Sequence, residues 1–249
     1  MTLDVRSIRA LSFDCYGTLI DWETGIWDAL QPLFLRHPDK APSREAALQA
    51  FSAIEPEIER MAPRRPYEMV LADAHARIAA QFGCRSSSAL DAAFGESLPH
   101  WPAFPDSAAA LRRLARRFKL LILSNVSNEG IRASVRKLGV SFDALYTAED
   151  IGSYKPDLAN FKHLLDHLDT DHGLPPTALL HVAESLFHDH VPARMLGLRT
   201  AWIDRRGLSA GAAPGATRLP EAQPDVTVTV RSLAALADAL LGPEVRAEG

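Results

Sequence analysis

The sequence predicts an α/β fold in which a parallel sheet is flanked by helices and carries an inserted helical segment. Two observations lead to this expectation. Through the second half of the chain, short apolar runs alternate with helical patterns, which is the order that a parallel sheet requires. Between the first apolar run and the rest, from about residue 22 to 99, helical periodicity recurs without a convincing strand. With 249 residues, the chain can bury a large core as one domain or as one domain with an insertion.

The first strand is expected at Ile8–Phe13, an apolar run that stops at Asp14. Gly17 and Thr18 follow within a turn. A carboxylate at the carboxyl end of a parallel strand, before a glycine-containing turn, lies where open α/β sheets bind their ligands. An aspartate that merely caps a turn would give the same local pattern. The other strand ends must therefore decide between the two interpretations.

Several helices are predicted between this strand and Trp101. Apolar residues recur at helical spacing in each, Ser43 is a candidate N-cap, and Gly83 suits the end of a helix. The expected helical ranges are 21–36, 44–59, 67–82 and 88–98. We expect residues 21–100 to form an inserted helical domain, and residues 1–20 and 101–249 to form the sheet domain.

Strands and helices are expected to alternate after Trp101. The predicted strands are 119–123, 144–147, 178–183, 200–203 and 225–230, and the predicted helices are 107–117, 129–138, 158–168, 192–196 and 233–241. The stretch Gly207–Pro224 is rich in glycine, alanine and proline without any period, so we expect an exposed loop there.

Polar residues also follow the later strand-like runs. They are Ser124 with Asn125, Lys155 at a helix entrance, and Glu184 with Asp189 a turn later. Because the carboxyl ends of parallel strands meet at one edge, these residues can converge with Asp14 on one pocket. Each could instead be a helix cap, a surface charge or a solvated helix start. Their joint occurrence in this order is harder to explain by capping alone.

Composition narrows the classes of function. Hydrophobic residues make up 47% and charged residues 23%, which is typical of a globular protein, and the net charge of −4 does not favour nucleic-acid binding. Two cysteines, Cys15 and Cys84, are too few for a disulfide framework or a zinc site. No apolar run is long enough to span a membrane and no secretory signal is visible, so a cytoplasmic protein is expected.

Four motifs together resemble those of the haloacid dehalogenase superfamily of hydrolases: FDCYGTL, LILSN, YKPD and HVAESLFHD. The resemblance covers most of the chain and implies a Rossmann-like sheet core with an inserted α-helical cap. It also implies that Asp14 is the nucleophile, with Ser124, Lys155 and the Glu184/Asp189 pair in the site. A carboxylate nucleophile forms an ester intermediate, and a nearby lysine keeps it ionised. Thr18, Ser124 and Asn125 are expected to hydrogen-bond its oxygens or the leaving group.

The phrase FDCYGTLIDW resembles the L-2-haloacid dehalogenase (type II) branch of that superfamily. Phosphatases of the superfamily carry a second aspartate two residues after the nucleophile, where this chain has Tyr16. With an ordinary pKa of about 10, tyrosine is a poor general acid at neutral pH. Halide needs no proton to leave. We therefore expect Asp14 to attack C2 of an (S)-2-haloalkanoate and water to hydrolyse the ester, with Asn125 holding the halide and Lys155 and Ser124 orienting Asp14.

The cap departs from that branch. Its well-known members carry a cap arginine for substrate and halide, but the matching helix here reads Gln49-Ala50-Phe51-Ser52. Arg60, Arg64 or Arg65 could reach in from the next connection, or form a solvated basic loop. The expected substrate contacts are Tyr16, Cys15, Trp22, Ser124 and Asn125.

Glu184 is the second departure, because the branch usually has a Ser-x-Asn arrangement there. With Asp14 and Asp189 it could supply the oxygen ligands that Mg²⁺ prefers, or it could pair with Lys155. We expect no essential metal and no required cofactor, with Mg²⁺ as the alternative. The competing functions are a Mg²⁺-dependent small-molecule phosphatase and a catalytically weakened binding protein on this fold.

Two smaller expectations complete the interpretation. His181, His188 and His190 match no standard metal-ligand spacing, and we expect them to be incidental residues of an exposed loop. The expected partner is a small-molecule substrate rather than nucleic acid or a membrane. A homodimer is also an expectation, because dimers are common in the family that the chain resembles.

Overall fold

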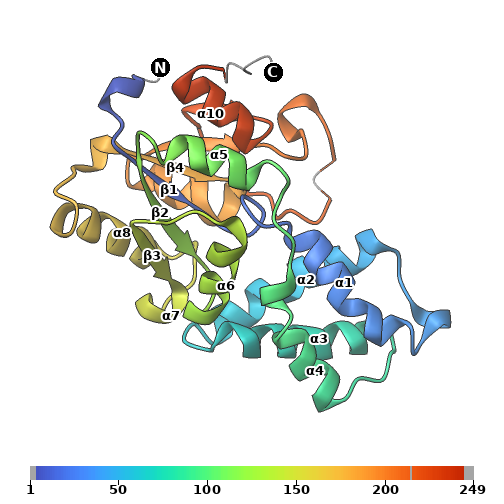
Figure 1. Ribbon diagram of the computed structural model, residues 1–249. Coiled ribbons are helices and arrows are strands. Elements are labelled where there is room, and N and C mark those ends of the chain that lie inside the picture. Colours follow the sequence, from blue (N-terminus) through green and yellow to red (C-terminus); the bar gives the residue numbers. More distant parts are fainter. Residues whose placement is uncertain (1–3, 214, 244–249) are drawn as a thin grey trace.

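A parallel sheet forms the centre of the computed structural model, which describes residues 4–213 and 215–243; within them the sheet has six strands in the order β3-β2-β1-β4-β5-β6. The strands are β1 (Ala10–Phe13), β2 (Lys119–Ser124), β3 (Ala144–Thr147), β4 (Leu179–Ala183), β5 (Arg199–Ile203) and β6 (Val228–Val230). All pairings are parallel. The expected fold class is confirmed. Because β1 lies between β2 and β4, the loops that follow these three strands face one another (Figure 1).

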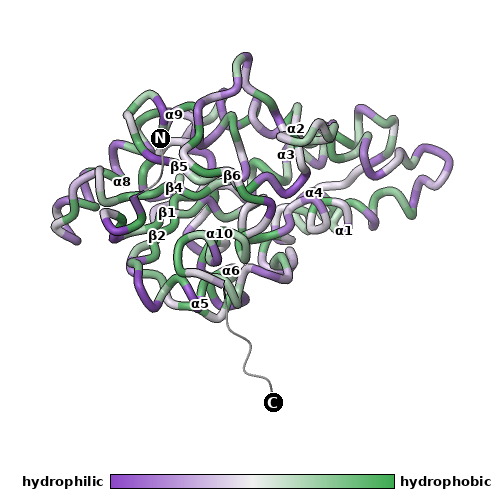
Figure 2. Tube along the Cα trace, turned by 90° about the horizontal axis from the view of Figure 1, so that it is seen from above, coloured by the Kyte–Doolittle hydropathy of each residue, from purple (hydrophilic) through white to green (hydrophobic). Residues whose placement is uncertain are grey.

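Helices cover both faces of the sheet. One face carries α5 (Ser107–Leu114), α6 (Asn128–Leu138) and α10 (Leu233–Leu241), and the other carries α8 (Leu158–Thr170) and α9 (Val191–Met195). The short α7 (Ala148–Ile151) follows β3. Side chains of β2 alternate between the two layers: Leu120 and Ile122 pack in the first, Leu121 and Leu123 in the second. Burial on both faces explains why the strands read as continuous apolar runs, and Figure 2 shows them in green between the helices.

The inserted segment is helical and lies beside the sheet (Figure 1). It contains α1 (Trp22–Phe34), α2 (Arg44–Met61), α3 (Tyr67–Gln81) and α4 (Ser88–Gly95). Asp21, Ser43 and Ser87 cap the first, second and fourth of these helices through their side chains. The domain boundaries at residues 21 and 100 stay a prediction, because one apolar core continues from the sheet into these helices.

Short turns of helix account for several connections. The 3₁₀ turns are η1 (Val5–Ser7), η2 (Pro38–Lys40), η3 (Leu98–His100), η4 (Pro176–Ala178) and η6 (Leu208–Ala210), and a π-helical turn forms η5 (Leu186–His190). The predicted helix 88–98 therefore stops at Gly95 and resumes as η3. No helix in the described part of the chain is long and apolar enough to cross a bilayer.

The expectation of an exposed loop at Gly207–Pro224 is wrong in its middle. Ala216 is buried, and together with Thr217 and Arg218 it lines a cavity at the carboxyl edge of the sheet. Thr217 Oγ1 donates a hydrogen bond to Glu184 Oε1, at 3.2 Å. An aperiodic sequence identifies a loop, but it does not show which residues of the loop are buried by tertiary contacts.

The contact between α3 and α4 gives a stability prediction. A Cβ atom at Gly95 would lie 2.4 Å from the Glu68 carbonyl oxygen on α3, so alanine must push the two helices apart. Helix propensity alone would instead favour alanine by about 1 kcal/mol. We expect Gly95→Ala to lower the free energy of unfolding by about 1–3 kcal/mol, measured by urea denaturation. Ala89→Gly, exposed on the same helix, gives the scale of a pure propensity effect; a stabilised Gly95→Ala variant would contradict the close packing.

Candidate active site

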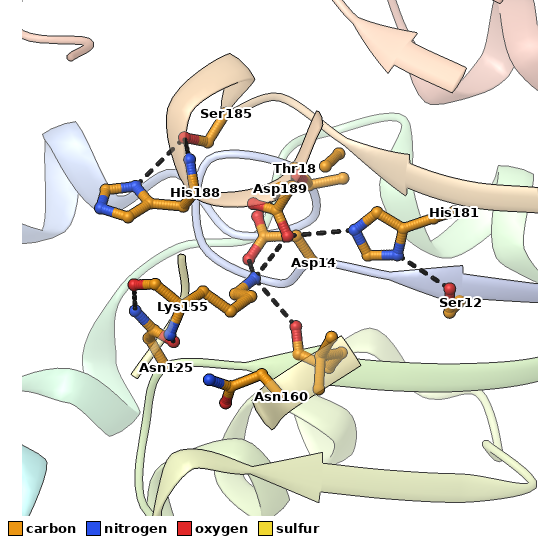
Figure 3. A network of polar contacts seen from close by, with 12 residues as sticks. Ser12, Asp14, Thr18, Asn125, Lys155, Asn160, His181, Ser185, His188 and Asp189 are labelled. Atoms are coloured by element: carbon orange, nitrogen blue, oxygen red, sulfur yellow. Dashed lines mark hydrogen bonds and ion pairs between the residues drawn. The ribbon is translucent and has the colours of Figure 1, made fainter. Parts of the chain in front are cut away.

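Polar side chains from separate segments meet at the carboxyl edge of the sheet (Figure 3). Asp14 follows β1, Ser124 ends β2, Lys155 lies between α7 and α8, and Asp189 lies in η5 after β4. They border a cavity of about 120 Å³ between the sheet and the cap helices. Of the residues predicted for the site, the cavity wall contains Asp14, Tyr16, Trp22, Ser124, Asn125, Lys155, Glu184 and Asp189.

Lys155 is the centre of this arrangement. Its Nζ donates to Asp14 Oδ1 at 2.9 Å, to Asp189 Oδ1 at 2.7 Å and to the Leu123 carbonyl oxygen at 3.0 Å. An ammonium group has three N–H donors, and here all three are used. Burial favours the neutral amine, but the two carboxylates outweigh it and raise the pKa of Lys155 above its ordinary value. Lys155 is therefore a fixed, buried cation.

Asp14 is held through both of its carboxylate oxygens. Oδ1 accepts from Lys155, and Oδ2 accepts from Thr18 Oγ1 at 2.7 Å. Thr18 Oγ1 in turn accepts from the Glu184 backbone N–H at 2.9 Å, which leaves its own hydrogen directed at Asp14. Burial raises the pKa of Asp14, while Lys155 and Thr18 limit the rise by favouring the carboxylate. Thr18 therefore hydrogen-bonds a carboxylate oxygen of Asp14, as its position in the motif predicted.

His181 extends the network and was missed by sequence reasoning. Its Nε2 lies 3.0 Å from Asp189 Oδ1, and its Nδ1 lies 2.8 Å from Ser12 Oγ on β1. Burial raises the pKa of Asp189, but Lys155 and His181 outweigh it and hold this pKa well below its usual range. The expectation of incidental loop histidines is wrong, because His181 and His190 are fully buried. The available signal was a histidine inside the apolar run of β4, where a buried polar group needs partners.

Ser124 and Asn125 have other contacts than those predicted. Ser124 Oγ is buried and has no hydrogen-bond partner among the described residues, so it does not orient Asp14 here and is free to bind a ligand. Asn125 Oδ1 accepts from the Lys155 backbone N–H at 2.7 Å, and its Nδ2 donates to the Lys155 carbonyl at 3.0 Å and to Glu59 Oε2 at 3.5 Å. Asn125 therefore holds the main chain of Lys155 and has no unused N–H for a halide.

Tyr16, Trp22 and Cys15, which were predicted to contact substrate near Asp14, differ in where their side chains lie. Trp22 lines the cavity, and so does the ring of Tyr16. The Tyr16 hydroxyl, however, lies 2.8 Å from Ser134 Oγ on α6, and burial raises its pKa well above the ordinary value. Cys15 is fully buried in the apolar core and is not part of the cavity wall, so the expected substrate contact of its side chain is wrong.

Glu184 lines the cavity but does not pair with Lys155, which corrects that expectation. Its Oε1 accepts from Thr217, and burial raises its pKa to about 8. Within residues 4–213 and 215–243, no three His, Cys, Asp or Glu side chains are gathered to hold a metal ion. Asp14 and Asp189 instead face the Lys155 ammonium from either side.

The cap wall of the cavity is acidic and aromatic. Phe51, Ser52, Glu55 and Tyr67 contribute to it, and Tyr67 donates a hydrogen bond to Glu55 Oε1 at 3.0 Å. Burial raises the pKa of Glu55 to about 7. None of the three arginines of the basic connection lines this cavity; Arg65, for example, pairs with Asp73 at 2.8 Å. The arginine in the described cavity wall is Arg218, from the loop after β5.

Comparisons with known proteins give matches in sequence and in fold. A sequence model of the haloacid dehalogenase-like hydrolase family matches residues 8–183. The (S)-2-haloacid dehalogenase of Pseudomonas sp. (strain YL) is 36% identical over 105 residues, which are 41% of this chain and 42% of that protein. The (S)-2-haloacid dehalogenase 4A of Burkholderia cepacia is 25% identical over 211 residues, 82% of this chain and 86% of that protein.

A solved structure shows the same fold. The L-2-haloacid dehalogenase of Xanthobacter autotrophicus, with chloropropionic acid covalently bound, superposes with a TM-score of 0.75 at 22% identity. The match covers 94% of this chain and 99% of that chain. It confirms the arrangement of sheet, flanking helices and inserted helices.

The buried lysine gives a prediction for stability. Lys155→Met should lower the free energy of unfolding by about 3–5 kcal/mol, because it leaves Asp14 and Asp189 buried without their cation. Urea denaturation at pH 7 measures the loss. In the double variant Lys155→Met/Asp189→Asn, one of the two charges is gone, so part of the stability should return. Equal losses in both variants would contradict the ion-pair account.

Glu55 gives a prediction for pH dependence. Between its ordinary pKa of 4.5 and its folded-state value of about 7, the folded chain holds a proton that the unfolded chain has lost. Stability contributed by this group therefore falls as pH rises through that window. Glu55→Gln should remove the effect. The difference in melting temperature, variant minus wild type, should therefore be larger at pH 8 than at pH 5. Calorimetry at both pH values tests this, with the exposed Glu57→Gln as the control; a constant difference would contradict it.

Proposed function

The chain belongs to the haloacid dehalogenase-like hydrolase family, and from this premise we propose that Asp14 is the nucleophile of a reaction on a 2-haloalkanoate that proceeds through an aspartyl ester. The observation that carries the proposal is the contact of Lys155 with Asp14 at the wall of a cavity of about 120 Å³. The Lys155 ammonium opposes the rise that burial causes in the pKa of Asp14, and its hydrogen bond holds the carboxylate in one orientation. Covalent catalysis of this kind divides a difficult displacement into two easier steps.

The character of the leaving group follows from the residues around Asp14. Departure of an alkoxide needs an acid near the reacting atom, and Tyr16 is the residue in the position where phosphatases of the family have one. Its hydroxyl contacts Ser134 on α6, and its raised pKa makes it a weak acid. Halide departs as an anion without a proton. These features support a carbon–halogen substrate over a phosphate ester, as do the names of the two relatives.

The proposed reaction has two steps. An Asp14 carboxylate oxygen attacks C2 of the (S)-2-haloalkanoate, the new C–O bond replaces the C–halogen bond with inversion, and halide leaves with the bonding electrons. Water then adds to the Asp14 carbonyl carbon, the 2-hydroxy acid leaves, and the carboxylate is restored with release of one proton. Lys155 stabilises the carboxylate form of Asp14 in both steps, and the free Ser124 hydroxyl is available to hydrogen-bond the substrate.

The proposal is tested by halide release from (S)-2-chloropropionate, with and without EDTA, beside p-nitrophenyl phosphate hydrolysis with Mg²⁺. We expect halide release that EDTA does not change. Phosphate release that requires Mg²⁺ would replace the proposal by a phosphatase. Binding of small acids without any turnover would replace it by a binding protein on this fold.

The nucleophile has its own test. Asp14→Asn should abolish halide release while the circular dichroism spectrum and the cooperative unfolding are kept, because the amide cannot attack carbon. In a single turnover of wild-type protein in H₂¹⁸O, one ¹⁸O atom should enter Asp14, seen as a mass increase of its peptide. Label found only in the hydroxy acid would show direct attack by water and overturn the ester.

A further inference from the structure

Arg218 is positioned to bind the charged end of an anionic substrate, and we propose that it is the carboxylate-binding residue of this site, held there by the Thr217–Glu184 contact. The inference rests on the proposed function, since it concerns the carboxylate of the haloacid. It also relates the two differences between this sequence and the dehalogenase branch. The cap lacks an arginine, and Glu184 stands where the branch usually has a serine.

Among the described residues, the lysine and arginine side chains that border the cavity are Lys155 and Arg218. Lys155 has no unused N–H, because Asp14, Asp189 and the Leu123 carbonyl take all three. Arg218 is the other lysine or arginine on the wall among the described residues. Its guanidinium makes no hydrogen bond or ion pair with those residues. A substrate carboxylate that met only Lys155 would have to break a buried contact, whereas Arg218 can bind it at no such cost.

Arg218 lies at the edge of the cavity. It borders the 120 Å³ cavity and also a neighbouring groove of about 930 Å³ that runs along α2, so it lies where the two meet. Its guanidinium carbon is 4.0 Å from the centre of the Phe187 ring in η5. Stacking on an aromatic face fixes the plane of the guanidinium and leaves its N–H edge free for a two-point contact with a carboxylate.

The loop that carries Arg218 is attached to the end of β4. Ala216 is buried and Thr217 donates to Glu184 Oε1, so both residues before Arg218 are fixed against the end of β4. Glu184 is itself fixed, because its backbone N–H donates to Thr18 and its carbonyl accepts from Trp202 Nε1 at 2.9 Å. Glu184 is therefore a positioning residue that carries the loop with Arg218 to the cavity.

The opposite wall supports the same orientation of the substrate. Glu55 and Glu59 lie one turn apart on α2, and Glu59 is 4% exposed with Oε1 unpaired among the described residues. Among the described residues of the cavity wall, the cap side carries no lysine or arginine that could pair with a substrate carboxylate, whereas the loop side presents Arg218.

The experiment compares an acid with its neutral analogue in the full-length protein. For Arg218→Gln we expect KM for (S)-2-chloropropionate to rise about five- to tenfold, as for an exposed charged contact, and KM for (S)-2-chloropropionamide to stay unchanged. Arg218→Lys should restore part of the affinity, and Thr217→Val should raise KM for the acid alone, because it loosens the loop. Arg112→Gln on α5, exposed and away from the cavity, controls for the change in net charge.

Either outcome decides the proposal. Equal effects of Arg218→Gln on acid and amide, or no effect, would overturn it while halide release by the wild type leaves the proposed function intact. If the wild type releases no halide from either compound, the proposed function fails. Calorimetric binding of (S)-2-chloropropionate to wild type and Arg218→Gln then tests the carboxylate site separately: weaker binding to the variant supports that site, and equal binding overturns it.

Discussion

The buried ion contact of Lys155 with Asp14 and Asp189 is the interaction on which the rest of the site depends. Removing three charges from water is costly, and it is tolerated only where geometry and hydrogen bonds replace the lost solvation. Here the replacement is complete for the ammonium, and Thr18 and His181 support the two carboxylates. Asn125 fixes the Lys155 main chain from both sides. A parallel sheet makes this possible, because its central strands bring residues distant in sequence to one edge.

The residues around the contact of Lys155 with Asp14 and Asp189 determine the charge and polarity of the cavity. On the sheet side, the cation is fully engaged, and the Ser124 hydroxyl is one of the buried groups that have no hydrogen-bond partner among the described residues. On the cap side, Glu55 contributes a carboxyl group whose pKa is raised by burial. The positive charge available to a ligand comes from a third direction, the loop after β5 that carries Arg218. An anion can thus be attracted to the site without disturbing the contact between Asp14 and Lys155.

Tyr16 occupies the position at which phosphatases of this family carry a second aspartate. An aspartate there could protonate a leaving oxygen, which is why this position bears on the proposed reaction. In this chain Tyr16 lines the cavity and packs edge-on against Trp101, while its hydroxyl contacts Ser134. A change at one such position would alter the chemistry without altering the fold, because function resides in the side chains of a site.

Much of this protein could be predicted from its sequence alone. The periodicity of apolar residues identified the strands and helices. Ser43 caps the start of α2 and Gly83 follows the end of α3 as expected, because caps are local hydrogen-bonding and backbone requirements. The convergence of Asp14, Lys155 and Asp189 followed from strand order. Contacts between distant segments were decided only by the tertiary structure: His181 against Asp189, Asn125 on the Lys155 main chain, Cys15 turned into the core, and Arg218 at the cavity. A local pattern fixes which residues form an element, but the direction of each side chain and its partner depend on how elements far apart in the sequence pack together.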